Sequence, residues 1–130
     1  MKLDILVLFA MQELKENELF KDSSNAVPKV PKEYKGYISS FGPSVIQSGL
    51  LPTIMFYENS KSTEKNGKKE ILNILSGILK KTGKYKMTPN SLKELTMDKI
   101  KNKAEYADLV NDVLDAYTAL KLSMRTFKFE

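Results

Sequence analysis

The sequence contains no cysteine, no histidine and no tryptophan. Without cysteine, neither a disulfide nor a thiolate metal site can form. Without histidine, the chain lacks the side chain that serves most often as a general base and as a transition-metal ligand. An enzyme would have to use Asp, Glu, Lys, Tyr or Ser alone. We therefore expect a non-catalytic protein with no catalytic residue, no bound metal and no cofactor.

Long hydrophobic runs are missing as well. The apolar run over residues 5–11 is far shorter than the roughly 20 residues of a membrane span, and no small-residue cleavage site follows it. The next apolar stretch, residues 45–57, is interrupted by Gln47, Ser48, Gly49 and Pro52. These patterns predict neither a signal peptide nor a transmembrane helix. We expect a soluble, cytoplasmic protein.

What the chain does have is an uneven distribution of charge. Its 130 residues fit one domain, 1–130, and the net charge is +5. Residues 60–103 contain twelve lysines and four acids, so this segment carries +8 and the remainder −3. A basic middle suggests a surface that faces a polyanion, but the charge alone favours the alternative of solvated helix faces and loops. Lysine supplies twenty of the twenty-one basic residues, which suits phosphate neutralisation better than base reading.

Apolar residues recur at intervals of three and four almost throughout, which is the period of an amphipathic helix. We predict an all-α, compact single-domain bundle of five to seven helices. The first helix covers about residues 3–20, a loop with Pro28 and Pro31 follows it, and a polar loop covers residues 58–70. A later helix ends with basic residues before Gly83, and Thr88–Pro89 open a short helix that carries Leu92, Leu95 and Ile100.

The middle of the chain contains two helix breakers. We predict that Gly42–Pro43 ends one helix and begins a short one, which places Val45 and Ile46 inward and ends at Gly49. Pro52 is expected in the first turn of the next helix, where its missing N–H costs nothing.

The final helix is predicted to be the longest, from about residue 103 to residue 127. Asn102 and Glu105 have the spacing of a capping box. An apolar stripe with Leu114 near its centre then follows. Asp108, Asp112 and Asp115 are expected on the opposite, solvated face, because three carboxylates on an open face lack the enclosure of a metal site.

Several basic residues are candidates for nucleic-acid binding. Tyr85 stands between Lys84 and Lys86 in a predicted connection, and an exposed tyrosine without a role is the alternative interpretation. The full set of candidates is Lys80, Lys81, Lys84, Tyr85, Lys86, Lys121 and Arg125. The other aromatic residues at core-like positions, namely Tyr34, Phe41, Phe56, Tyr106 and Tyr117, are interpreted as structural.

The most specific stretch is residues 34–57. The motif residues within it are Tyr34, Tyr37, Pro43, Ile46, Gly49, Leu50 and Phe56. This pattern resembles that of the small subunit of type III-B CRISPR (Cmr) effectors, and Tyr106, Lys121 and Arg125 match the long last helix of that family. The chain departs from the family pattern by lacking a tryptophan near the C-terminus and by having Pro52.

The resemblance implies a scaffold protein of antiviral defence. It implies a helical bundle that stacks head to tail with other copies of itself and contacts the backbone and large subunits of the effector. It also implies contact with the duplex of guide RNA and target RNA, with sequence recognition left to base pairing. The alternative is a helical nucleic-acid-binding or adaptor module unrelated to CRISPR. A helix-turn-helix version of it is weak, because acids dominate the outer face of the last helix. An enzyme is the third hypothesis.

Overall fold

The computed structural model describes residues 2–16, 29–30, 33–58, 67–86, 92–125 and 128–129. This part of the chain contains six helices: α1 (Leu3–Glu16), α2 (Glu33–Ser48), α3 (Leu50–Glu58), α4 (Gly67–Lys81), α5 (Leu92–Lys99) and α6 (Lys103–Met124). Two strands of two residues each, β1 (Lys29–Val30) and β2 (Lys128–Phe129), pair in parallel, with Lys29 opposite Lys128. The predicted all-α bundle of five to seven helices with a long last helix is confirmed.

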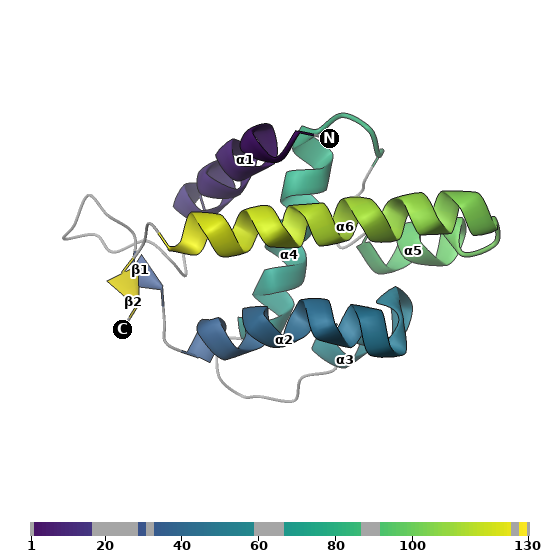
Figure 1. Cartoon of the computed structure of the whole chain (residues 1–130), viewed down its shortest axis with the longest axis horizontal. Helices are drawn as coiled ribbons and strands as arrows, with labels where there is room; N and C mark the ends of the chain where they lie inside the picture. The colour runs from purple at the N-terminus through teal and green to yellow at the C-terminus, as the bar shows by residue number, and fades with distance from the viewer. Residues whose placement is uncertain are drawn as a thin grey trace.

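Helix α6 is the central element of the bundle. In Figure 1 it crosses the middle of the molecule, with α1 above it, α2 below it and α4 crossing behind it. It contacts α1, α2, α4 and α5. Because neighbours surround it, its buried residues extend well beyond one stripe: Leu109, Asp112, Val113, Ala116, Tyr117, Ala119, Leu120, Ser123 and Met124.

The start of α6 agrees with the predicted cap. The Asn102 side chain accepts a hydrogen bond of 3.0 Å from the backbone N–H of Glu105. The Glu105 carboxylate does not complete the box; it accepts from Lys99 at 3.3 Å instead. The cap thus satisfies one of the first N–H groups of the helix, and the Lys99 contact ties the end of α5 to α6.

The predicted break at Gly42–Pro43 is wrong, because α2 continues through both residues to Ser48. A proline inside a helix removes the N–H that would bond the carbonyl four residues earlier, here that of Ser39. In this chain the Tyr117 hydroxyl donates to the Ser39 carbonyl at 3.3 Å and replaces that bond. Gly42 makes the approach possible, since a Cβ there would lie 2.4 Å from the Tyr117 ring.

Two residues that the sequence placed in the core are exposed, Ile46 on α2 and Phe56 on α3. Val45 is buried as expected, but Ile46 is 76% exposed, because the unbroken helix rotates it out of the interface. Phe56 on α3 is also not a core residue, with 63% of its surface exposed. Gly49 does end α2, with a positive φ of 97°, and the Leu50 N–H that follows donates to the Tyr106 hydroxyl at 3.3 Å.

Other boundaries shift by a few residues. Helix α4 begins at Gly67, inside the predicted polar loop, and Ile100 lies beyond the end of α5 and is exposed. Pro52 stands at the third residue of α3, in its first turn, as predicted. The predicted extension of the first helix to Phe20, the loop prolines Pro28 and Pro31, and Thr88–Pro89 lie outside the described residues.

The burial of α6 gives a stability test. Leu120 is fully buried, whereas Leu114, predicted from the sequence to be central, is only partly buried against the core. Leu120→Ala should lower the free energy of unfolding by about 2–5 kcal/mol, because it leaves a cavity in close-packed surroundings. Leu114→Ala should cost distinctly less. Urea unfolding of both variants checks this, and equal losses would contradict the packing of α6.

Candidate nucleic-acid interface

The predicted basic residues divide between internal ion pairs and the surface. Lys81, in the last turn of α4, points to α1, where its Nζ lies 3.0 Å from Glu13 and 3.5 Å from Glu16. The hydrogen bond to Glu13 is the main reason why the pKa of Lys81 is raised. Lys81 therefore joins α4 to α1, and the two carboxylates neutralise its charge.

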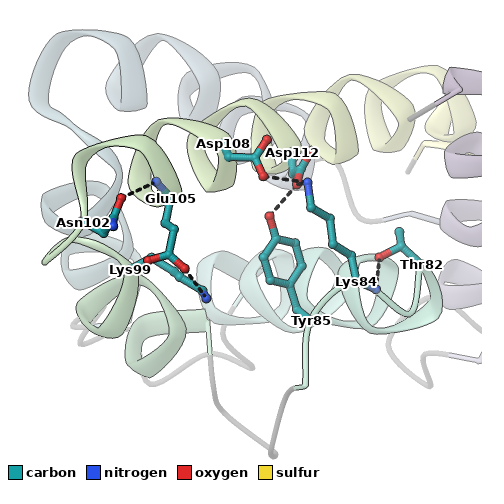
Figure 2. Close-up of polar contacts among 8 residues, drawn as sticks. All are labelled: Thr82, Lys84, Tyr85, Lys99, Asn102, Glu105, Asp108 and Asp112. Atoms are coloured by element: carbon teal, nitrogen blue, oxygen red, sulfur yellow. Dashed lines mark hydrogen bonds and ion pairs between the residues drawn. The ribbon is translucent and has the colours of Figure 1, made fainter.

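Lys84 and Tyr85 follow α4 and point to α6 (Figure 2). The Lys84 Nζ lies 2.7 Å from a carboxylate oxygen of Asp108 and 2.7 Å from one of Asp112. The Tyr85 hydroxyl donates to the same oxygen of Asp112. Figure 2 shows the tyrosine ring and the lysine side chain reaching α6 together from the α4–α5 connection. We call Lys84, Tyr85, Asp108 and Asp112 the clamp.

The clamp corrects the interpretation of Asp112. Its side chain is only 8% exposed, so it does not lie on a solvated face as predicted, whereas Asp108 is 58% exposed. Hydrogen bonds to Asp108 and Asp112 raise the pKa of Lys84. Burial, followed by the bond to Asp112, raises the pKa of Tyr85. Tyr85 is thus a partly buried structural donor rather than an exposed ring.

The four lysines around the end of α4 do not converge on one outer surface. Lys80 and Lys86 are exposed, but Lys81 and Lys84 diverge to α1 and α6. Each of these two inward cations meets two carboxylates. The positive charge that the sequence concentrates in this region is therefore largely neutralised within the fold.

The other candidate pair, Lys121 and Arg125, lines a cleft of about 510 Å³ between α2 and α6. Lys35 of α2 is the third cation of the cleft, and its described lining is completed by Ser39, Ile38 and Met124. Ile38 and Met124 are buried, so the cations surround an apolar floor. The described lining contains no acid, and we call this site the cationic cleft.

Sequence reasoning found Lys121 and Arg125 but missed Lys35. Lys35 and Ser39 are one turn apart on α2, next to the buried Ile38, which is a spacing that marks the edge of a helix interface. That spacing could have identified Lys35 as a rim residue. It could not show that the last turn of α6 lies opposite.

No group of three or more acidic side chains within the described residues could hold a metal ion. Among the helices in that part of the chain, none combines the length and apolar character of a membrane span.

The clamp yields a stability prediction. The buried Asp112 carboxylate accepts hydrogen bonds from the Lys84 ammonium and the Tyr85 hydroxyl. Asp112→Asn removes its negative charge and should lower the free energy of unfolding by about 1–3 kcal/mol. Asp108→Asn is the matched control; its side chain is mostly exposed, so it should cost at most about 1 kcal/mol. Chemical denaturation measures both, and a smaller loss for Asp112→Asn than for Asp108→Asn would refute the burial of the clamp.

The clamp also predicts an alkaline transition. The folded-state pKa of Tyr85 is raised, so its contribution to stability is complete below the unfolded pKa of about 10 and is lost as the pH rises through the higher folded value. Lys84 acts in the same direction. The stability difference between the wild type and Tyr85→Phe should therefore shrink as the pH rises above about 10. Urea titrations at several alkaline pH values test this, and a constant difference would contradict it.

The chain matches a family model described as CRISPR-associated protein (Cas_Cmr5) over residues 9–125. No curated protein and no solved structure matches the chain. The matched residues include all six helices apart from the first turns of α1. This confirms the resemblance to the small subunit of type III-B effectors that the motif over residues 34–57 indicated. The chain belongs to the Cas_Cmr5 family of CRISPR-associated proteins.

Proposed function

We propose that this protein is a non-catalytic small subunit of a type III-B CRISPR (Cmr) effector and that its cationic cleft faces the phosphates of the guide–target RNA duplex. Family membership supports a place in the Cmr complex and leaves no ground for a module unrelated to CRISPR. The observation that carries the placement is the cleft, where Lys121 and Arg125 lie one helical turn apart and α2 lines the opposite side.

The cleft has the chemistry of backbone recognition. Lys121 lies in the last turn of α6 and Arg125 is its C-cap; both are exposed and stand one helical turn apart. The Lys121 ammonium lies 5.2 Å from the centre of the Tyr117 ring, which limits its orientation. Cations at this spacing can neutralise phosphates without reading bases, as expected where guide pairing supplies the specificity.

The remaining roles belong to the assembly. In this proposal the subunit acts in the cytoplasm, stacks head to tail with further copies of itself, and contacts the backbone and large subunits in antiviral defence. It supplies position and charge, while other subunits supply the chemistry. The few lysines of one copy give weak RNA binding, and neighbouring subunits add avidity.

The test is charge reversal in the assembled effector. Lys121→Glu with Arg125→Glu should weaken binding of target RNA and reduce the log–log salt slope by about 0.9 for each lost contact on a duplex. The matched control is Lys101→Glu with Lys103→Glu, which makes the same charge change on exposed residues at the opposite end of α6. Binding is measured by fluorescence anisotropy over a salt series.

A neutral pair, Lys121→Gln with Arg125→Gln, separates charge from folding. Basic residues at a helix C-terminus favour the helix, so reversal alone could loosen the last turn of α6. The neutral pair should keep helicity by circular dichroism and still reduce the salt slope. A cleft variant that binds target RNA as the Lys101 and Lys103 control does, at low and at physiological salt, would rule out the cleft as the RNA contact.

A further inference from the structure

A lysine lies between two aromatic rings at the point where α2, α3 and α4 meet. The Lys68 Nζ in the first turn of α4 is 4.5 Å from the centre of the Phe56 ring and 5.5 Å from that of Tyr37. Phe56 is 63% exposed, while Lys68 and Tyr37 are partly buried. The site therefore combines a largely exposed ring with an ammonium held over one of its faces, which leaves the opposite face for a ligand. We call these three residues the aromatic platform.

Lys68 differs from the lysines that stabilise the fold. A carboxylate lies within 4.0 Å of the ammonium group in each of Lys81, Lys84, Lys93 and Lys99. Within the described part of the chain, the Lys68 ammonium contacts two aromatic rings and has no carboxylate within that distance. It also stands at the positive end of the α4 dipole, where a cation is disfavoured. The adjacent Lys69 is exposed and adds a second positive charge. This environment favours an anion.

We infer that the aromatic platform is a stacking site for an unpaired RNA base, with Phe56 taking the base and Lys68 the adjoining phosphate. The inference rests on the proposed function and adds a second kind of RNA contact to it. Any base presents a π-face, so such a site is tolerant of sequence. An arginine or lysine of a protein partner would also suit a ring, but the charges of Lys68 and Lys69 disfavour it.

The platform and the cationic cleft lie on different flanks of α2. Lys35 and Ser39 line the cleft, while Tyr37 lies two residues from each and contacts Lys68. Residues two apart in an α-helix differ by about 200° around the axis. The two surfaces can therefore be tested independently, one with a duplex and the other with a single strand.

The test uses the full chain and a short single-stranded RNA that carries the fluorescent base 2-aminopurine, at low salt. The wild type should quench the fluorescence by stacking. Phe56→Leu keeps the apolar bulk but removes the π-face, and should weaken binding at least about fivefold and abolish the quenching. Phe56→Trp should retain both signals. Met55→Leu is the matched control, because it changes the neighbouring exposed apolar residue without touching a ring.

Two outcomes would overturn the inference. Equal RNA affinity and equal quenching for the wild type and Phe56→Leu, including no binding by either, would show that no base stacks on Phe56. Loss of folded Phe56→Leu from the assembled effector, with RNA binding by the isolated chain unchanged, would show that the ring binds a neighbouring subunit instead. Binding of duplex RNA by the Lys121 and Arg125 variants is measured in a separate experiment. A negative result for base stacking on Phe56 can therefore be distinguished from a negative result for the proposed function.

Discussion

The contact between Tyr117 and the middle of α2 supports the continuous helix that contributes residues to both proposed RNA-binding surfaces. The Tyr117 hydroxyl bonds the Ser39 carbonyl, which the proline at position 43 leaves without its helical partner. The absence of a side chain at Gly42 gives the ring its space. Because of this contact α2 is one continuous helix, and every residue on it has a fixed rotational position. Lys35 then faces the end of α6, and Tyr37 faces the start of α4.

The same packing explains why the charge of the sequence does not map directly onto a binding surface. Lysines around the end of α4 are close in sequence, but α1 and α6 approach that end from different directions and bring carboxylates with them. Lys81 and Lys84 act as ties between helices. The cationic cleft instead brings together basic residues that are far apart in the sequence, Lys35 of α2 with Lys121 and Arg125. Local composition counts charges, whereas the electrostatic field at a surface depends on which acids the fold brings beside them.

Sequence reasoning was reliable where a signal is local and periodic. The helical class, the start of α6 at Asn102 and the end of α2 at Gly49 follow from spacing and cap chemistry, and the structure confirms them. It was wrong where a distant residue decides the outcome. Pro43 breaks no helix because Tyr117, more than seventy residues later, replaces the lost hydrogen bond. Asp112 is buried because the α4–α5 connection covers a face that looks solvated on a helical wheel. Lys35 was missed for the same reason: the residues near it in the sequence do not indicate that the end of α6 packs beside it.

A continuous α2 also affects how the two weak RNA contacts proposed here combine into a useful affinity. The cationic cleft offers few charges and the aromatic platform offers one accessible ring, so neither can bind RNA tightly alone. Each includes a residue of α2, Lys35 in the cleft and Tyr37 in the platform, and α2 packs against α3, α4 and α6, which carry the other residues or adjoin them. Their separation and relative rotation are therefore fixed, and occupying one does not require ordering of the other. Weak sites with a fixed geometry gain most in affinity when the subunit is repeated along a rigid assembly. The RNA and the assembly then lose their entropy of alignment once, rather than at every contact. A small subunit with this construction suits a role in which affinity arises from the array.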